Sequence, residues 1–501
     1  MVRGTRDADL RDAVAVEAPV ILDPRVTVWS EGAFVSGGSP WRFVRLSAAA
    51  SNFLRRVRSA GPRGLVPGES DRAAVSALVA RGIVHPLPSA RTGDHDVRIV
   101  IPAFGRPEAL ARCLDRLTGL DVVVVDDATP DGDSMRSVAE SRGVSYVRLP
   151  VNVGPGAARN AGMVSTHAAL VAFVDSDCQP TRGWLDALVA HFDDPRVGAV
   201  APRILPTTAG ATLLERFEGM SSALDMGDRP ALVRPGAALG FLPSATLVVR
   251  RVALEDGGFD ERLRLGEDVD LVWRLADAGW LVRYDPSVVV THEMRDTWQE
   301  WVTRRYEYGT SAASLELRHP GRLSPVRLSA LNAASLGLIV AGKPVVAAAL
   351  SGASAALLAR RLRAKGGTIA MAVSLVARGL LADGTAVGHA LRREYWPVGM
   401  LAMAAAPWSR PARVAVGLMI GPVIWDWGRS THALDPVRYS AARLLADAAY
   451  GTGVQASAWR ARTPSPLVPT LRNLDRLDPR KLWGGGRRSP APRSEPRTSS
   501  R

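Results

Sequence analysis

The sequence predicts an α/β protein: a domain built on a mostly parallel sheet, with a small N-terminal module and a helical, apolar C-terminal region. Three observations predict this. From residue 97 onward, apolar runs of strand length alternate with helix-like segments, which is typical of a parallel sheet with right-handed helical crossovers. Residues 20–90 contain a hairpin-like stretch followed by two short amphipathic segments. After residue 323, Ala-rich apolar runs replace this alternation.

Length and composition limit the class of protein. The chain has 501 residues, enough for two to four domains. Its net charge is +14, but only three of its 63 basic residues are lysines and the arginines are scattered, so we expect no nucleic-acid partner. The two cysteines, Cys113 and Cys178, imply no disulfide framework and fit a reducing compartment. The N-terminus lacks the apolar core of a secretory signal.

The N-terminal module is predicted over residues 20–93, after a flexible segment at 1–19. The stretch VTVWSEGAFVSGG is expected to form a hairpin that turns near Glu31. Ser47 is placed to cap a helix that runs through Val57. Strands followed by two short helices indicate a winged-helix-like module, and the polar sequence RTGDHD links it to the next domain.

The α/β domain is predicted over residues 97–322. Strands and helices alternate in the order VRIVIPAF, PEALARCLDRL, DVVVVDDAT, a helix near 133–142, VSYVRLP, the helix opened by NVGPGAARNAGMVS, and ALVAFVDSD. Three of the strand ends carry acids or Gly-rich turns. In open α/β sheets ligands bind beyond the carboxyl ends of the strands, so we expect these groups to line one edge of the sheet.

One acid pair stands out from the others. Asp175 and Asp177 directly follow a continuous apolar run of strand length. Two carboxylates held close together repel each other, and a divalent cation relieves that repulsion; oxygen ligands of this kind suit Mg²⁺ or Mn²⁺. The alternative is that one aspartate caps the helix that starts near residues 181–184. These residues alone leave both interpretations open.

A second acid cluster lies in GEDVDLVWRL. Gly266 precedes a helix, and side chains three or four residues apart share one face of a helix. Asp268 therefore lies on the apolar face with residues such as Leu271, whereas Asp270 faces Arg274 in what we expect to be an exposed ion pair. An inward carboxylate at a helix N-terminus is suited to act as a general base. Helix capping is the alternative.

The region from 323 to 460 is predicted to be helical and membrane-associated. Its apolar runs include LSALNAASLGLIVAG, PVVAAALSGASAALLA, WPVGMLAMAAAPWS and VAVGLMIGPVIW. Each run is shorter than the roughly 20 residues that cross a bilayer, and Gly-Lys-Pro at 342–344 should break a helix. Re-entrant or interfacial helices are expected, with tilted spans or a soluble bundle as alternatives. Residues 461–501 form a predicted disordered tail rich in Arg, Pro and Ser, suited either to anionic lipid or simply to solubility.

Five stretches between about residues 97 and 310 occur in the order of a known family: VRIVIPAFGR, VVVVDDATPD, NVGPGAARNAG, FVDSDCQP and GGFDERL…GEDVDLVWRL. In these the chain resembles the family-2 inverting glycosyltransferases of GT-A fold. The resemblance implies a metal-dependent hexosyltransferase. It also implies roles: Ala103, Phe104 and Arg106 beside the base of a nucleotide sugar, Asp127 on the base or ribose, Arg159 and Asn160 against the nucleotide, Asp175 near the ribose or metal, Asp177 and His292 on the metal, and Asp268 as base.

The whole chain also resembles a narrower group, the mycofactocin-system glycosyltransferases of actinobacteria. GGSPWRFVRLS in the N-terminal module is similar to PqqD-like peptide-recognition domains, and HEMRDTWQEWVTRRYEYGTSAASL and the Ala-rich third also match. The resemblance implies transfer of glucose from UDP-glucose to a peptide-derived redox cofactor, as a β-1,4-glucan, at the cytoplasmic face of the membrane. One alternative is a polyprenyl or cell-wall glycan acceptor. Another is a peptide-binding scaffold with an inactive transferase domain, against which the intact set of acids argues.

Overall fold

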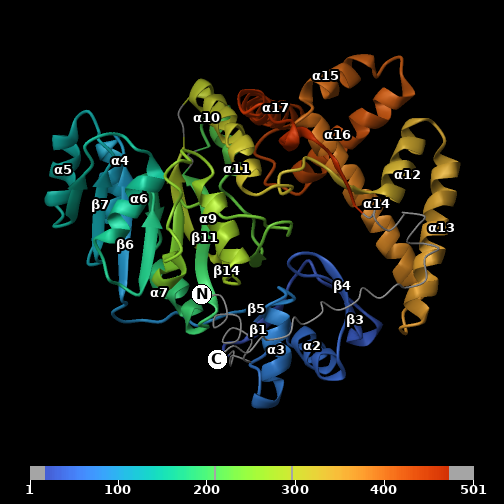
Figure 1. The fold of residues 1–501 in the computed structure, drawn as a ribbon, viewed down its shortest axis with the longest axis horizontal. Coiled ribbons are helices and arrows are strands. Elements are labelled where there is room, and N and C mark those ends of the chain that lie inside the picture. Colours follow the sequence, from blue (N-terminus) through green and yellow to red (C-terminus); the bar gives the residue numbers. More distant parts are fainter. Residues whose placement is uncertain (1–16, 208–209, 295–296, 473–501) are drawn as a thin grey trace, which may run out of the picture.

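A computed structural model describes residues 17–207, 210–294 and 297–472. The α/β domain, the N-terminal module and the C-terminal helices are three neighbouring parts, with the module below the other two in Figure 1. The predicted α/β class and GT-A architecture are confirmed. The flexible N-terminus was predicted for residues that lie almost wholly outside the described part of the chain.

The first half of the central sheet is parallel, as predicted. Its strands lie in the spatial order β9-β6-β7-β8. Their bounds are Val97–Ala103 for β6, Val122–Asp126 for β7, Ser145–Arg148 for β8 and Leu170–Val174 for β9. The connecting helices are α4 (Pro107–Asp115), α5 (Gly132–Glu140) and α6 (Pro155–Val164). Because these strands run the same way, β6, β7 and β9 all end at the same edge of the sheet.

Both faces of these strands are buried, which explains their continuous apolar sequence. In β6, Ile99 and Ile101 belong to the core on one face of the sheet, and Val100 belongs to the core on the other face. Helix α6 lies close to the second face at Gly162, where an added Cβ would come within 2.3 Å of the Val100 side chain. Successive side chains along a strand therefore point alternately into two separate hydrophobic cores.

The second half of the sheet is mixed. Strand β13 (Thr246–Arg250) pairs antiparallel with β9 and with β11 (Val197–Thr207), and β14 (Leu281–Glu293) runs parallel to β11. Two short strands, β10 (Cys178–Pro180) and β12 (Ala231–Val233), pair antiparallel with β14. The remaining helices of the domain are α7 (Trp184–Val189), α8 (Leu213–Ser221) and α9 (Glu267–Asp277). The β10–β14 pairing sets Cys178 opposite His292, so β14 ends beside the acid pair.

The N-terminal module contains the predicted hairpin and helices. Strands β2 (Thr27–Trp29) and β3 (Phe34–Gly37) pair antiparallel around a turn in which Glu31 has φ of 52°, and β4 (Arg42–Arg45) adds a third strand. Ser47 caps α2 (Ala48–Ala60) by accepting a hydrogen bond from the Ala50 amide. The module is completed by α3 (Arg72–Val79) and by β1 (Val20–Leu22) paired with β5 (Val84–Pro86).

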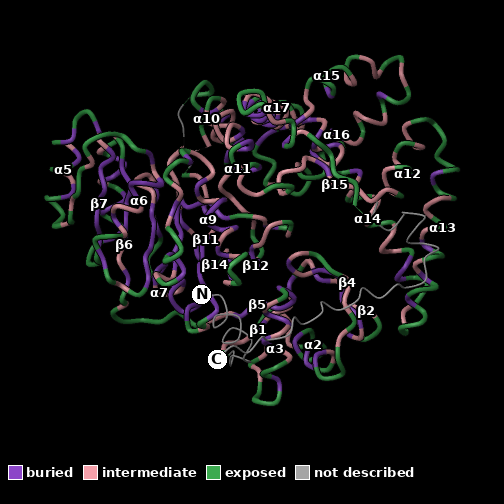
Figure 2. Tube along the Cα trace, viewed as in Figure 1, coloured by how far each residue is buried: buried purple, intermediate pink, exposed green. Residues whose placement is uncertain are grey.

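The C-terminal region is helical, as predicted. Its helices are α10 (Trp298–Thr310), α11 (Ala312–Arg318), α12 (Ala330–Val340), α13 (Pro344–Arg363), α14 (Ile369–Arg392), α15 (Trp396–Ala405), α16 (Arg410–Gly428) and α17 (Pro436–Arg460). The predicted break at 342–344 separates α12 from α13. The helices are longer than the apolar runs that predict them: α13 has 20 residues, and α14, which has 24, is not among the predicted runs. Many residues along α12 to α15 are exposed or half-exposed, in contrast to the buried strands (Figure 2).

The predicted start of the disordered tail at residue 461 is also wrong. Strand β16 (Thr470–Arg472) pairs in parallel with β15 (Arg327–Ser329), which ties this part of the chain to the start of the helical region. The Thr470 amide donates to the Val326 carbonyl at 2.8 Å, so backbone hydrogen bonding holds this stretch although its sequence is poor in large apolar residues. The rest of the predicted tail lies outside the described residues.

Helix α17 packs unusually close to α10 and to the end of α14. An added Cβ at Gly309 would lie 2.1 Å from the Tyr450 carbonyl oxygen, and one at Gly453 would lie 2.0 Å from that of Tyr306. At Gly451 the corresponding distance to the Arg393 carbonyl oxygen is 1.7 Å. Since real Cβ atoms are not found so close to backbone atoms, these glycines allow the helices to touch through their backbones.

Candidate active site

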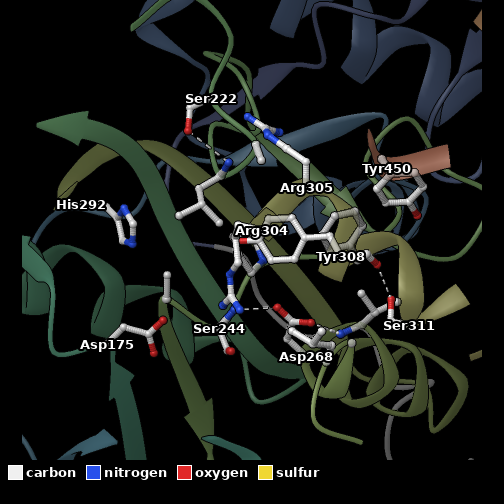
Figure 3. A pocket seen from close by; sticks show the side chains of 18 of the residues that line it. Asp175, Ser222, Ser244, Asp268, His292, Arg304, Arg305, Tyr308, Ser311 and Tyr450 are labelled. Atoms are coloured by element: carbon white, nitrogen blue, oxygen red, sulfur yellow. Dashed lines mark hydrogen bonds between the residues drawn. The ribbon is translucent and has the colours of Figure 1, made fainter. Parts of the chain in front are cut away.

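A cavity of about 1,220 Å³ opens where β6, β7 and β9 end. One wall comes from these strand ends and from α9, and the other comes from α10, α14, α16 and α17. Figure 3 shows Asp175, Asp268 and His292 on the first wall and Arg304, Tyr308 and Tyr450 on the second. The α/β domain and the C-terminal helices therefore share one site.

Asp127 shapes the floor of this cavity. It follows β7 directly, and its two carboxylate oxygens accept hydrogen bonds of 2.8 Å from the backbone amides of Val153 and Gly154. Gly154 has φ of 97°, which favours glycine, and it precedes α6. Asp127 thus fixes the Gly-rich turn against the strand ends.

Arg159 connects the acid pair to α9. Its guanidinium is buried and donates to Asp175 at 2.6 Å and to Glu267 at 2.9 Å. It also lies over the ring of Phe259 at 5.2 Å. A buried cation with two carboxylate partners is compensated, whereas loss of either partner would leave charge uncompensated. The end of β9 and the start of α9 are therefore held together by charge.

Asp177 and His292 meet at the end of the β10–β14 pair. The His292 Nε2 lies 3.3 Å from one Asp177 oxygen, and Arg106 donates to the other oxygen at 3.1 Å. Glu293, which the sequence analysis did not single out, binds Arg106 at 3.3 Å and Arg112 at 2.6 Å. Within the described ranges, no group of three or more His, Cys, Asp or Glu side chains is arranged to hold a metal ion. An adjacent carboxylate and imidazole are nevertheless donors that suit a divalent ion whose other ligands are phosphates.

Asp268 faces the cavity from the first turn of α9, which begins at Glu267 as predicted. Its carboxylate accepts hydrogen bonds from the amides of Val269, at 2.7 Å, and Ser244, at 3.3 Å (Figure 3). Burial raises the pKa of Asp268 above its ordinary value, although these amides oppose the rise. Burial also raises the pKa of Glu267 to about 7. A carboxylate with a raised pKa at a cavity wall is suited to accept a proton.

The predicted environment of Asp270 is wrong. Asp270 does pair with Arg274, at 2.8 Å, but it is fully buried and also binds Arg318 and His319, each at 2.8 Å. The helical phase that separated it from Asp268 is correct. The opposite side of α9 is covered by α11 and the residues after it, which a pattern limited to one helix does not reveal.

The structure gathers eight of the ten predicted site residues around the cavity: Ala103, Phe104, Asp127, Arg159, Asp175, Asp177, Asp268 and His292. The other two are not among the described residues that line it. Arg106 turns to Asp177 and Glu293, and Asn160 both donates to the Phe259 carbonyl, at 2.8 Å, and accepts from the Phe259 amide, at 2.9 Å. The roles predicted for all ten residues stay predictions.

The second wall was missed by sequence reasoning. Its polar residues include Arg304 and Tyr308 on α10, Arg393 after α14, and Tyr450 on α17. The only available signal was the occurrence of charged and aromatic residues within otherwise apolar helices, as in HALRREY at 389–395. Such residues are usually solvated, and only the packing of α17 against α10 turns them toward the acids.

Comparison with known proteins gives this arrangement a class. Residues 98–257 match the model of glycosyl transferase family 2, so the α/β domain is a family 2 glycosyltransferase domain. Over 480 residues the chain is 37% identical to the pre-mycofactocin glycosyltransferase of Mycobacterium tuberculosis, covering 92% of this chain and 99% of that protein. The chain therefore belongs to the pre-mycofactocin glycosyltransferase family.

More distant relatives share a smaller part of the chain. Glycosyltransferase AglE of Haloferax volcanii is 28% identical over 213 residues, which cover 40% of this chain and 67% of AglE. Among solved structures, a mannosyltransferase of Pyrobaculum calidifontis in complex with GDP-Man and Mn²⁺ superposes with a TM-score of 0.41 at 19% identity, covering 74% of this chain and 90% of that one.

Proposed function

We propose that the protein is an inverting, metal-dependent hexosyltransferase that moves glucose from UDP-glucose to a peptide-derived redox cofactor of the mycofactocin type, building a β-1,4-glucan. One observation carries the proposal: Asp268 lines the same cavity as Asp175 and Asp177, the acids that follow the end of β9. The relative in Mycobacterium tuberculosis is named for a pre-mycofactocin acceptor, which supports the acceptor class.

The proposed transfer reaction follows from the side chains that line this cavity. Asp268 accepts the proton of an acceptor hydroxyl, and the oxygen attacks the anomeric carbon of the donor. The bond from that carbon to the diphosphate oxygen breaks, and attack from the face opposite this bond inverts the configuration. Asp177 and His292 would hold a divalent cation, which when bound supplies positive charge for the diphosphate leaving group. Arg159 keeps Asp175 and α9 in a fixed relation.

The direct test offers the purified protein a panel of sugar nucleotides with Mn²⁺ and a peptide-derived acceptor, and identifies the product by mass and by anomeric configuration. A β-linked hexose from UDP-glucose supports the proposal. A polyprenyl phosphate acceptor belongs in the same panel, because the long apolar helices α13 and α14 favour it as the second candidate. Transfer to neither acceptor from any donor would refute the proposal.

Metal dependence is the first prediction. Turnover should fall on addition of EDTA and return with Mn²⁺. Asp177→Asn should raise the Mn²⁺ concentration for half-maximal turnover by at least about 10- to 100-fold, since loss of even an outer partner of a metal ligand costs that much. Asp131→Asn, an exposed aspartate that caps α5, is the control. Unchanged turnover in excess EDTA would contradict this assignment.

Membrane association is proposed in interfacial form. Helices α13 and α14 are long and apolar enough to cross a bilayer. However, Leu362 near the end of α13 and Met371 at the start of α14 pack against Phe34 of the N-terminal module, and Arg378 donates to Thr27 at 2.8 Å. A transmembrane hairpin would carry the α13–α14 turn to the far side of the membrane from that module. The packing therefore favours helices that lie at the surface of the bilayer.

The lipid-facing part is expected at the opposite end of these helices. Val345, 81% exposed, lies two residues after Lys343 at the start of α13. Trp408, 84% exposed, lies two residues before Arg410 in the turn between α15 and α16. The α12–α13 and α15–α16 turns lie on the side of the helices away from the blue module in Figure 1. Exposed apolar and aromatic side chains beside basic ones are typical of interfacial binding to anionic lipid.

The second prediction follows. The double variant Val345→Ser and Trp408→Ser should bind phosphatidylglycerol vesicles about tenfold more weakly, because binding strength scales with buried apolar area. Vesicle co-sedimentation gives the affinity. Val164→Ser, an equally exposed apolar residue at the end of α6, should leave it unchanged. Equal binding by the double variant and the wild type would refute the interfacial arrangement.

The N-terminal module is proposed to recruit the acceptor. Strand β4 is one edge of the sheet β2-β3-β4, and an edge strand is a ready site for an extended peptide. Trp41, 59% exposed, lies directly before β4. The third prediction is that Trp41→Ala raises the KM for the acceptor while the KM for the sugar nucleotide is unchanged. An unaltered acceptor KM would show that this edge has another role.

A further inference from the structure

The second wall of the cavity contains two tyrosines, each with an arginine over its ring. The guanidinium carbon of Arg393 lies 3.5 Å from the ring centre of Tyr450, and that of Arg304 lies 4.9 Å from the ring centre of Tyr308. All four residues line the same cavity as Asp268. Each stacked pair offers the cavity a flat surface with hydrogen-bonding groups on its rim.

The backbone fixes this wall in place. The Gly451 contact brings the backbone of Arg393 onto α17, and the Gly309 contact brings α10 onto the backbone of Tyr450. Neither contact leaves room for a Cβ. The two stacked pairs therefore keep a constant relation to each other, as expected for a preformed binding surface.

The charged groups near Tyr450 each have a partner of opposite charge, with Asp447 shared by two arginines. Asp447 accepts a hydrogen bond of 2.9 Å from Arg392 and lies 3.6 Å from Arg443, and Glu394 lies 3.4 Å from Arg393. Burial lowers the pKa of His389 to about 3, so its imidazole is neutral at physiological pH. A wall with paired charges, many hydrogen-bonding groups and flat surfaces favours a neutral polyhydroxylated ligand over an anion.

The size of the cavity points the same way. Its volume of about 1,220 Å³ exceeds the roughly 300–1,000 Å³ of pockets that enclose one drug-sized ligand. The strand ends account for the part where the sugar nucleotide is proposed to bind. The space beside α10, α14 and α17 is left for a second ligand.

We propose that the pairs Arg393–Tyr450 and Arg304–Tyr308, which we call the arginine–tyrosine wall, bind the sugar units already attached to the acceptor. This inference rests on the proposed function and adds to it a glycan subsite built by the C-terminal helices. A chain held on this wall would present its terminal hydroxyl to Asp268. The wall would thereby make extension of a chain more efficient than its initiation.

Binding of cellotriose to the full-length protein, saturated with UDP and Mn²⁺, tests the subsite by calorimetry without any turnover. Tyr450→Ala should weaken cellotriose binding by about tenfold, the factor that corresponds to one aromatic contact. Trp459→Ala, which removes an 86% exposed aromatic side chain from the same helix, is the matched control and should leave it unchanged. Thermal unfolding shows that both variants are folded. Absent cellotriose binding, or equal binding by Tyr450→Ala and wild type, overturns the subsite.

Product length gives a second readout. With UDP-glucose, Tyr450→Ala should lose more of its kcat/KM for an acceptor that carries sugars than for the sugar-free acceptor, and its products should be shorter by mass. Equal losses for the two acceptors would overturn the inference. Failure of the proposed function is distinguishable, because a protein that does not use UDP-glucose would still give an interpretable result in the cellotriose titration.

Discussion

Replacing Asp268 with Asn should lower kcat by about 10²- to 10⁴-fold, the range for loss of a general base. Asn keeps the shape of the side chain and still accepts a hydrogen bond from the Val269 amide, but it cannot take the proton of the acceptor hydroxyl. Because Asp268 is not proposed to contact the nucleotide, the affinity for UDP should change little. Steady-state kinetics and calorimetric titration with UDP give the two quantities.

The control lies on the same helix. Asp277 is half-exposed and pairs with Arg322 at 2.8 Å, so Asp277→Asn should cost at most about 1 kcal/mol of stability and leave kcat unchanged. The wild-type enzyme offers a second check. Since burial raises the pKa of Asp268, kcat/KM should fall on the acid side at a pH above the ordinary Asp value of about 4. Full activity of Asp268→Asn would show that Asp268 is not the general base.

Replacing Asp270 with Asn should lower the free energy of unfolding by about 3–5 kcal/mol, which is the cost of removing one partner from a buried ion pair. Asp270 is fully buried between Arg274, Arg318 and His319, and Asn would leave the two guanidinium groups without their shared carboxylate. Chemical denaturation of the wild type and the variant measures the difference. The surviving folded fraction should bind UDP normally, because Asp270 does not line the cavity.

The pH dependence of this difference follows from the pKa of Asp270. Burial opposes ionisation, yet the bonds from Arg318 and Arg274 hold the pKa of Asp270 below its ordinary value. A carboxyl group with a depressed pKa contributes stability that is present above its unfolded pKa, about 4, and lost as the pH falls through its folded pKa. The difference in the free energy of unfolding between wild type and Asp270→Asn should therefore become smaller below about pH 4. A small difference at neutral pH would mean that the arginines find other partners.

The sequence predicts the α/β core well because each buried strand carries its own signal. The apolar run before Asp175, the Pro at the start of α4 and the Gly before α9 are local features, and the elements they predict are confirmed. The environment of Asp270 depends instead on Arg318 and His319, about 50 residues away, and helical periodicity contains no information about such a partner.

The same distinction explains the second half of the site. Asp127, Asp175 and Asp268 follow recognisable strand or helix signals. Tyr450 reaches the cavity only because Gly309 and Gly453 let α17 approach α10. The sequence around either glycine does not indicate which helix packs against it. The antiparallel insertion of β13 beside β9 likewise depends on pairing between segments more than 70 residues apart.

The backbone contacts between α10, α14 and α17 also determine how the cavity can open. Helices that touch through glycines cannot slide or rotate past each other without bringing side chains into the contact. These three elements would therefore have to move as one rigid block, with any change of dihedral angles confined to the segments that connect the block to the α/β domain. Entry of a large acceptor would then require displacement of the whole helical wall, and the shape of that wall would be the same before and after each sugar is added.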